Sequence, residues 1–277
     1  MTLFARFIFA SITLCLLAGS SFAAAPLRIV STNGTLSEIL VGLGLEKQIV
    51  GVDVTSTYPA SLDKLPKIGH NRSISAEGII SLNPDVIVYT DQSMIPPAVL
   101  KQLQNTGKKV VLFKHELSKE GAVNLIREVG AYFNAKPQAE KMVKTLQADL
   151  AKIQTSKAPK KLLFIYARGT GTLMVSGTGT SLDKMFQLAG HKNAVQGFTE
   201  FKPLTAESLV TANPDVLVLF QSGLESLEGI DGLLRVPGIA STNAGRNRKI
   251  VTMDGQFLTG FGPRLGKAAQ ELSQKVK

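Results

Sequence analysis

Three histidines are the side chains of this 277-residue chain best suited to binding a metal or a cofactor. Cys15 is the only cysteine, so ligation elsewhere must use histidine, tyrosine, methionine or a carboxylate. His191 lies at the end of an expected helix, where the helix dipole favours a cation. His115 follows an expected strand and is either exposed in a turn or directed into a cleft. A three-histidine zinc site would require both to converge with His70.

His70 differs from the other two in its surroundings. It stands in the turn Gly69-His70-Asn71-Arg72, just before a helix expected over 75–82. A neutral imidazole can bind a metal, and Arg72 keeps its charge at any physiological pH. The turn is consistent with an exposed loop or with contact to a metal-containing, anionic ligand.

Signatures of common enzyme classes are absent from the sequence. There is no nucleophile elbow, no complete phosphate-binding loop and no zinc-protease helix. Gly177-Thr178-Gly179 begins like a dinucleotide fingerprint, but Leu182 occupies the place of the third glycine. We therefore interpret the glycine-rich run from Gly169 to Gly179 as flexible backbone at a cleft edge, and we predict no catalytic residue and no enzyme activity.

The N-terminus has the pattern of an export signal. Arg6 precedes an apolar run over 7–17, and Ser21-Phe22-Ala23 forms a small-x-small cleavage site. Residues 1–23 are therefore predicted to be removed near Ala23. Cys15 lies inside this segment after a bulky residue, which argues against a lipid anchor, so the exported chain is predicted to contain no cysteine and no disulfide.

Composition and charge narrow the class of ligand. Hydrophobic residues make up 44% and charged residues 19%, as in a folded globular protein, and the formal net charge is +10. Export and the scattered placement of the basic residues argue against nucleic acid as a partner. An anionic small molecule or an acidic protein surface remains.

The elements that position these residues alternate between strands and helices. Strands are expected over 27–31, 49–52, 86–89 and 110–113, with helices over 36–43, 75–82 and 97–105 between them. This alternation predicts an α/β fold with mostly parallel sheets flanked by helices.

An internal repeat shows that the chain has two similar halves. Ser75 to Val88 returns 130 positions later as Thr205 to Val218, with seven of fourteen residues identical. In each copy a Ser or Thr caps a short helix, Asn-Pro-Asp ends it in a turn, and a β-branched run forms a core strand.

The repeat predicts two lobes joined by one long helix. The expected lobes cover 24–137 and 160–277, and the linking helix covers 138–157 because apolar residues recur there on one helical face. Two lobes on one helix leave a crevice between them, which is a common place for a ligand.

Three segments carry a resemblance to a known family. They are Arg28-Ile-Val-Ser with Leu45 to Gly51, Leu65 to Ile79 around His70, and Gln196-Gly-Phe198 with Pro203 to Glu207. Together they resemble the periplasmic haem-binding proteins of bacterial ABC haem importers, over essentially the whole exported chain. The two lobes and the long helix also resemble the wider class III of substrate-binding proteins, which take up siderophores, cobalamin and haem.

The resemblance implies a set of haem-contacting residues. His70 stands where the family usually has a tyrosine that binds haem iron, and imidazole is also a competent axial ligand. Some members have a second iron ligand, a histidine on the first strand of the C-terminal lobe; Arg168 matches that position and cannot ligate, which leaves Tyr166 as a substitute. For the haem propionates and the porphyrin face the expected contacts are Arg72, Arg168, Lys202 and Arg264, with Phe201, Phe257 and Phe261 as apolar walls.

The resemblance also implies partners. Glu77 and Glu207 occupy equivalent repeat positions, one on each lobe, where proteins of this class bind arginine pockets of the permease; a carboxylate there also stabilises the helix start. The expected protein is a periplasmic monomer that passes haem, its transported ligand, to an ABC permease and ATPase complex at the inner membrane.

Two alternatives remain open at this stage. The same fold could bind a ferric siderophore or cobalamin, in which case His70 would not ligate iron. An exported enzyme on the same scaffold would need a bound metal cofactor and catalytic groups that the sequence does not show.

Overall fold

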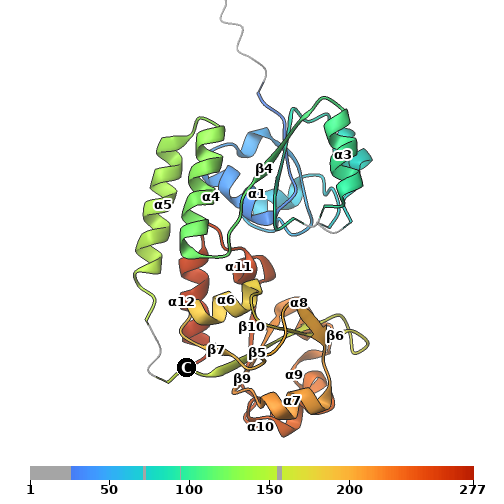
Figure 1. The fold of residues 1–277 in the computed structure, drawn as a ribbon, viewed down its shortest axis with the longest axis vertical. Helices are drawn as coiled ribbons and strands as arrows, with labels where there is room; N and C mark the ends of the chain where they lie inside the picture. Colours follow the sequence, from blue (N-terminus) through green and yellow to red (C-terminus); the bar gives the residue numbers. More distant parts are fainter. Residues whose placement is uncertain (1–25, 71–72, 94, 155–157) are drawn as a thin grey trace, which may run out of the picture.

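The computed structural model describes residues 26–70, 73–93, 95–154 and 158–277. Two lobes are stacked along the long axis, and helices α4 (Lys119–Tyr132) and α5 (Lys136–Leu150) lie together on one side of the molecule (Figure 1). The expected export signal and Arg72 fall outside the described residues.

The N-terminal lobe contains a four-stranded, wholly parallel sheet. Its order is β2 (Ile49–Val52), β1 (Ile29–Ser31), β3 (Val86–Thr90), β4 (Lys109–Phe113). The strands predicted from the sequence are confirmed to within two residues at each end. The connecting segments contain α1 (Gly34–Gly42), α2 (Ala76–Ile80), α3 (Pro97–Asn105) and the 3-10 turns η1 (Glu46–Gln48) and η2 (Ala60–Lys64).

The C-terminal lobe has a mixed sheet. Its order is β10 (Ile250–Met253), β9 (Val216–Phe220), β5 (Lys161–Ala167), β6 (Leu173–Ser176), β8 (Phe201–Pro203), and β7 (Lys192–Asn193) also pairs with β5. The β5–β6 and β6–β8 pairs are antiparallel and the others are parallel. The helical elements are α6 (Ser181–Leu188), α7 (Ala206–Ala212), α8 (Gln221–Glu225), α9 (Gly229–Leu234), η3 (Ile239–Ser241), α10 (Asn243–Arg246), α11 (Gly255–Thr259) and α12 (Leu265–Lys275).

The sequence repeat folds twice into the same unit. Ser75 caps α2 by accepting from the Gly78 N–H, and Thr205 caps α7 in the same way from Ser208, both at 3.1 Å. The Asn of each Asn-Pro-Asp turn, Asn83 and Asn213, adopts the left-handed conformation, at φ 44° and 40°. Asparagine tolerates this conformation better than most residues. The repeat is therefore a structural duplication of cap, helix, turn and strand.

The linking helix α5 is shorter than the segment predicted for it. It begins at Lys136 and ends at Leu150, whereas the apolar pattern continues to Ile153. Gln270 on α12 donates to the Asp149 carbonyl at 2.6 Å, which satisfies one acceptor of the last turn. The end of the helix is thus set by contact with α12, which single-segment periodicity does not show.

One hydrophobic core runs through both lobes. It joins one face of each sheet, represented by Ile29 and Phe164, to α5 residues such as Val143 and to α12 residues such as Leu272. The opposite face of the first sheet packs on α2 and α3, and that of the second packs on α7, α9 and η3. The lobes therefore share a core along the side that carries α5.

No helix in the described part of the chain is both long and apolar enough to cross a membrane.

Candidate functional site

Four aromatic side chains form a row on the C-terminal lobe, on the sheet face that belongs to the shared core. The ring centres of Phe164 and Phe220 are 4.8 Å apart, and those of Phe220 and Tyr166 are 6.4 Å apart and nearly perpendicular. Phe201 stands edge-on to Phe164 at 6.4 Å. Phe164 is fully buried, whereas Phe201, Phe220 and Tyr166 are partly exposed. The row thus emerges from the core as an apolar, partly solvent-accessible surface of tilted and edge-to-face rings.

Tyr166 and Arg168 lie at the end of this row. They are two residues apart and therefore on the same face of the chain where β5 ends. The Arg168 guanidinium carbon is 5.9 Å from the Tyr166 ring centre, and the Arg168 N–H donates to the Thr172 carbonyl at 3.1 Å to close the β5–β6 turn. An exposed cation thus stands beside a half-buried phenol.

Lys202 adds a second cation to this lobe. Its ammonium lies 4.8 Å from the ring centre of Phe198, and the residue is exposed on β8 next to Phe201. Among the predicted ligand-binding residues, Tyr166 and Phe201 share the sheet face of the shared core, whereas Lys202 lies on the opposite face with Val175 and Phe198.

His70 lies on the N-terminal lobe in a turn fixed by its backbone. Gly69 has φ 106°, which glycine adopts without strain, and its carbonyl accepts from the Val54 N–H at 3.0 Å. The His70 carbonyl accepts from Ser73 at 2.7 Å. The ring is half-buried, so the turn holds it at a fixed place while leaving part of it accessible.

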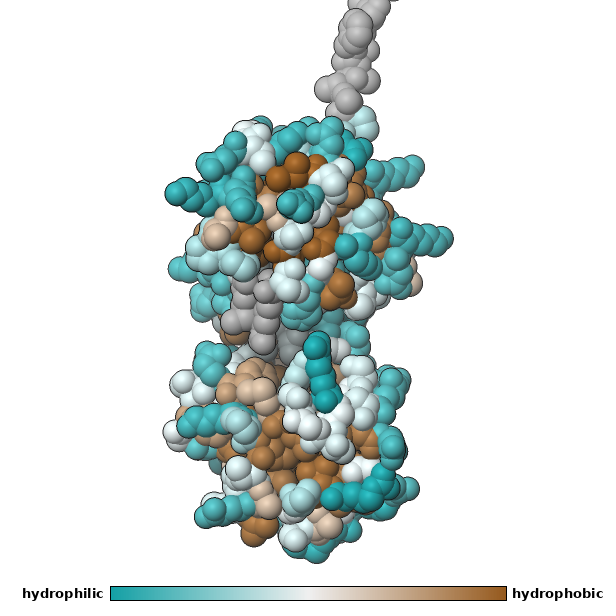
Figure 2. Space-filling view, turned by 90° about the vertical axis from the view of Figure 1, so that its right-hand side faces the viewer, coloured by the Kyte–Doolittle hydropathy of each residue, from teal (hydrophilic) through white to brown (hydrophobic). Residues whose placement is uncertain are grey.

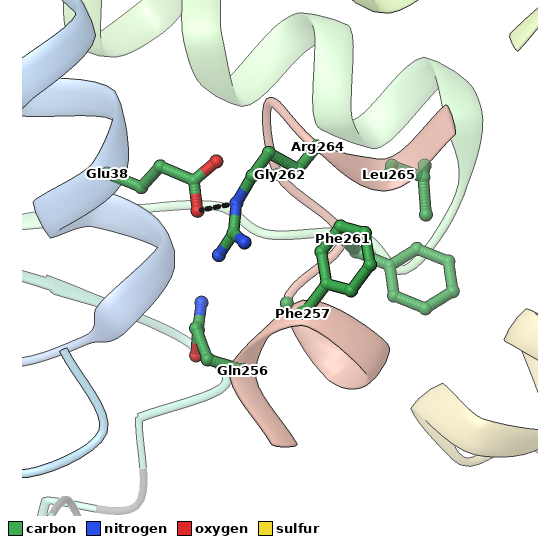
Figure 3. Close-up of a pocket in the computed structure, with 8 residues that line it drawn as sticks. Glu38, Gln256, Phe257, Phe261, Gly262, Arg264 and Leu265 are labelled. Carbon is green, nitrogen blue, oxygen red and sulfur yellow. Dashed lines mark hydrogen bonds and ion pairs between the residues drawn. The ribbon is translucent and has the colours of Figure 1, made fainter. Parts of the chain in front are cut away.

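Polar contacts between the lobes surround Arg264 (Figure 3). Its Nε donates to Glu38 Oε2 of α1 at 2.9 Å, and its guanidinium lies 3.7 Å from the ring centre of Tyr58 and 4.9 Å from that of Phe257. Thr35, on the same helix as Glu38, donates to the Gly260 carbonyl at 2.6 Å. Arg264, predicted to contact haem, is therefore engaged in a contact between the lobes, and Phe257 packs beside it.

The Glu38–Arg264 pair is largely buried and incompletely bonded. The side chains are 9% and 20% exposed, and Glu38 Oε1 and Arg264 Nη2 are buried without a hydrogen-bond partner. Burial raises the pKa of the Glu38 carboxyl, although the charge of Arg264 and its hydrogen bond oppose the shift.

His115 makes another contact between the lobes. It is buried, and its Nε2 lies 3.1 Å from the Phe261 carbonyl, so the neutral ring donates there. Nδ1 is buried without a partner. Burial lowers the pKa of His115, while the Phe261 carbonyl and Asp91 act in the opposite direction. The expectation of an exposed turn histidine is wrong, because the C-terminal segment around Phe261 covers this turn.

His191 is also buried, at the end of α6. Its Nδ1 accepts from the Lys160 N–H at 3.2 Å. Burial lowers its pKa, and the positive charge of Lys160 adds to the effect. In the described ranges, no group of three His, Cys, Asp or Glu side chains is arranged to hold a metal ion, so a three-histidine zinc site does not form there.

Glu77 and Glu207 occupy the first turns of α2 and α7. Both are exposed, and within the described residues neither carboxylate has a hydrogen bond or an ion pair. The structure thus presents them as two equivalent free acids, one on each lobe.

The described residues enclose a small cavity between the lobes and a larger hollow on the C-terminal lobe. The one in Figure 3 has a volume of about 10 Å³, room for one water molecule at most, between Glu38, Phe257 and Arg264. A hollow of about 420 Å³ lies beside the β5–β6 turn, lined by Gly169, Leu173, Leu227, Arg235 and neighbours. The second contains none of the predicted site residues. The surface narrows to a waist between the lobes, and hydrophobic side chains gather on the lower lobe beneath it (Figure 2).

Sequence reasoning missed Glu38, Tyr58 and Phe220. Glu38 had a usable signal, since it is the only charge in the apolar helix Gly34–Gly42. Phe220 ends the strand of the second repeat copy, but nothing in its local pattern indicated contact with Tyr166. Tyr58 lies outside any periodic segment, so only the tertiary structure shows its stacking on Arg264.

The comparisons with known proteins agree with this architecture. Residues 29–257 match the family described as periplasmic binding protein. The periplasmic haem-binding protein RhuT from Roseiflexus sp. RS-1 is 38% identical, with a TM-score of 0.87 over 91% of this chain and 98% of that one. The haem-binding protein HmuT is 30% identical, with a TM-score of 0.82 over 91% and 85%. Structures are also known of HmuT variants in which a tyrosine, a histidine or an arginine is replaced by alanine.

A more distant relative binds another ligand. The vitamin B12-binding protein of Photorhabdus laumondii is 25% identical over 260 residues, which cover 92% of this chain and 90% of the relative. The resemblance inferred from the sequence is thereby confirmed. With its α/β lobes, its linking helix and a match over residues 29–257, the chain belongs to the periplasmic binding protein family, in the class that includes haem- and vitamin B12-binding members.

Proposed function

We propose that this protein binds haem between its lobes in the periplasm and delivers it to an ABC permease and its ATPase, without catalysing a reaction. The observation that carries the proposal is Tyr166 on β5 with Arg168 directly after the strand. In HmuT, the tyrosine and the arginine that were replaced by alanine are also two positions apart. The replaced histidine precedes that tyrosine by nearly as many residues as separate His70 from Tyr166.

The chemistry of these residues suits ferric haem. Imidazole and tyrosinate are both axial ligands of haem iron in proteins, and His70 and Tyr166 lie on different lobes, so one iron held by both would close the cleft around the porphyrin. The positive charge of Arg168 would compensate the negative charge that a tyrosinate ligand carries. The aromatic row that includes Phe220 and Phe201 offers the porphyrin an apolar wall.

The propionates require cations at the edge of the site. Arg168 and Lys202 are exposed on the C-terminal lobe, and Arg72 follows His70 in the sequence but outside the described residues. Arg264 is engaged by Glu38, so we rank it below the other three as a propionate partner. The free carboxylates Glu77 and Glu207 are the proposed contacts to the permease.

A visible-absorbance titration with ferric haem tests the proposal. We expect a saturable Soret shift for the protein without residues 1–23, a changed Soret position for Tyr166→Phe and for His70→Ala, and at least tenfold weaker binding when both are combined. Tyr89→Phe, a half-buried tyrosine on β3, is the matched control and should behave as the unmodified protein.

Two outcomes would contradict the proposal. If both ligand variants keep the unmodified spectrum and affinity, iron is not bound by these residues. If cobalamin binds tightly and haem does not, the alternative favoured by the vitamin B12-binding relatives holds, and His70 and Tyr166 would have no ligand role.

A further inference from the structure

Two exposed aliphatic side chains occupy the same position of the structural repeat. Ile80 near the end of α2 is 38% exposed and Val210 in α7 is 51% exposed. In the described part of the chain the other exposed large hydrophobic residues are Val54, Tyr58, Leu112 and Tyr132. Residues next to the exposed pair, Ile79 and Leu209, are fully buried. The helices are thus fixed by their buried neighbours and hold the aliphatic side chains outward.

Each aliphatic side chain has a free acid beside it. Glu77 precedes Ile80 by three residues and Glu207 precedes Val210 by three, which places acid and aliphatic residue on one side of a single helical turn. We call Glu77 with Ile80 the first patch and Glu207 with Val210 the second patch. Each patch combines one exposed carboxylate with one exposed apolar group.

Each patch lies over the sheet face that is turned away from the shared core of its lobe. The shared core contains α5 and one face of each sheet. The α2 helix covers the opposite face of the first sheet through Ala76 and Ile79, and α7 covers the opposite face of the second through Leu209. The two patches thus have equivalent positions on their own lobes, each outside the core that the lobes share.

We infer that Ile80 and Val210 are apolar anchors for a protein partner that presents the same surface twice, an apolar depression bordered by a cation. The inference rests on the proposed delivery to a permease and adds a contact to the two glutamates. Near-identical patches on two lobes match a partner built from paired, equivalent subunits. The acids stand out in a chain of net charge +10, so a cationic border is the complementary feature.

The acid and the aliphatic group of each patch perform different tasks. Charges at a rim mainly steer association and determine its dependence on salt. An apolar side chain that becomes fully buried mainly slows dissociation, by about tenfold or more for a residue of this size. The glutamates should therefore control the association rate and the aliphatic residues the dissociation rate.

Binding kinetics to the ABC haem permease of the same organism, held in lipid nanodiscs, tests this division. We expect Ile80→Ser with Val210→Ser to raise the dissociation rate at least tenfold, and to leave the association rate and its salt dependence within about twofold. Glu77→Gln with Glu207→Gln should lower the association rate and flatten its salt dependence. The control is Tyr132→Ser, which at 39% is about as exposed as Ile80 and lies outside both patches, on α4 beside α5.

The result that overturns the inference is a dissociation rate of the double serine variant equal to that of the control, or no binding of the unmodified protein to the permease. A Soret titration of the same samples separates this from the proposed function. Unchanged haem affinity with unchanged dissociation refutes the anchors alone. If the double serine variant dissociates from the permease tenfold faster, but the unmodified protein does not bind haem, the anchors are supported and the proposed haem binding is refuted.

Discussion

Glu38 and Arg264 form a largely buried ion pair between the lobes. Removing one partner of a buried pair leaves the other charge without compensation, whereas replacing both with apolar residues avoids that cost. We predict that Glu38→Leu lowers the free energy of unfolding by roughly 3 kcal/mol. Urea denaturation followed by circular dichroism measures it.

The double variant Glu38→Leu with Arg264→Met provides the control for this prediction. It should lie within about 1 kcal/mol of the unmodified protein, because no isolated charge is left behind. If the double variant loses as much stability as the sum of the two single variants, the two side chains act independently and the pair is not the source of the effect.

His115 should make stability depend on pH. In the unfolded chain it titrates near 6.5, and in the folded protein burial lowers its pKa. Between those two values the unfolded chain binds a proton that the folded protein does not, so stability falls as pH drops below about 6.5 and levels off below the folded pKa. The slope from this residue can reach about 1.4 kcal/mol per pH unit.

The comparison variant is His115→Gln, which keeps a donor for the Phe261 carbonyl and does not titrate. The unfolding free energies of the two proteins are measured from pH 8 to pH 5, and their difference gives the contribution of His115 alone. The comparison is needed because the raised pKa of Glu38 makes the protein more stable as pH falls, which opposes the effect of His115. Parallel curves for the two proteins would show that His115 does not titrate differently on folding.

At the scale of elements, close helix contacts fix the position of α5. A methyl group on Gly266 of α12 would lie 2.7 Å from the Leu150 nitrogen and 2.8 Å from the Asp149 carbonyl carbon. Backbone atoms cannot give way as a flexible side chain can, so we predict that Gly266→Ala destabilises the protein by about 1–3 kcal/mol. The matched comparison is Gly171→Ala, because no atom lies within 4 Å of a methyl group placed there. Thermal unfolding gives the melting temperatures of the two variants. Equal melting temperatures would refute the close contact.

Local pattern was sufficient to predict most elements but few of their contacts. The caps Ser75 and Thr205 and the turns at Asn83 and Asn213 depend on residues that are neighbours in sequence, so they could be read directly. The haem-contacting residues came from resemblance and remain predictions. The end of α5, the burial of His115 and the pairing of Glu38 with Arg264 depend on residues far apart in the chain, and no periodicity encodes them.

The whole molecule combines two sheets with a single continuous core, and this limits how far the lobes can move. Domains in one chain move relative to each other unless their interface is large and hydrophobic. Here α5 and α12 contribute to one core with both sheets, and the contacts of Arg264 and His115 add polar links across the junction. Opening by a wide hinge would expose this core, so closure around a ligand should be small.

Distances between spin labels test this prediction on the protein without residues 1–23, which has no cysteine of its own. Labels at Lys101→Cys on the N-terminal lobe and Lys249→Cys on the C-terminal lobe, both exposed, should give one narrow distance distribution that shifts by no more than a few ångströms when haem is added. The same pair in the Glu38→Leu background should broaden, because that variant removes the main charged link between the lobes. Two resolved populations in the unmodified protein would mean that the core separates in solution, and the lobes would then open by a hinge that the shared core does not restrain.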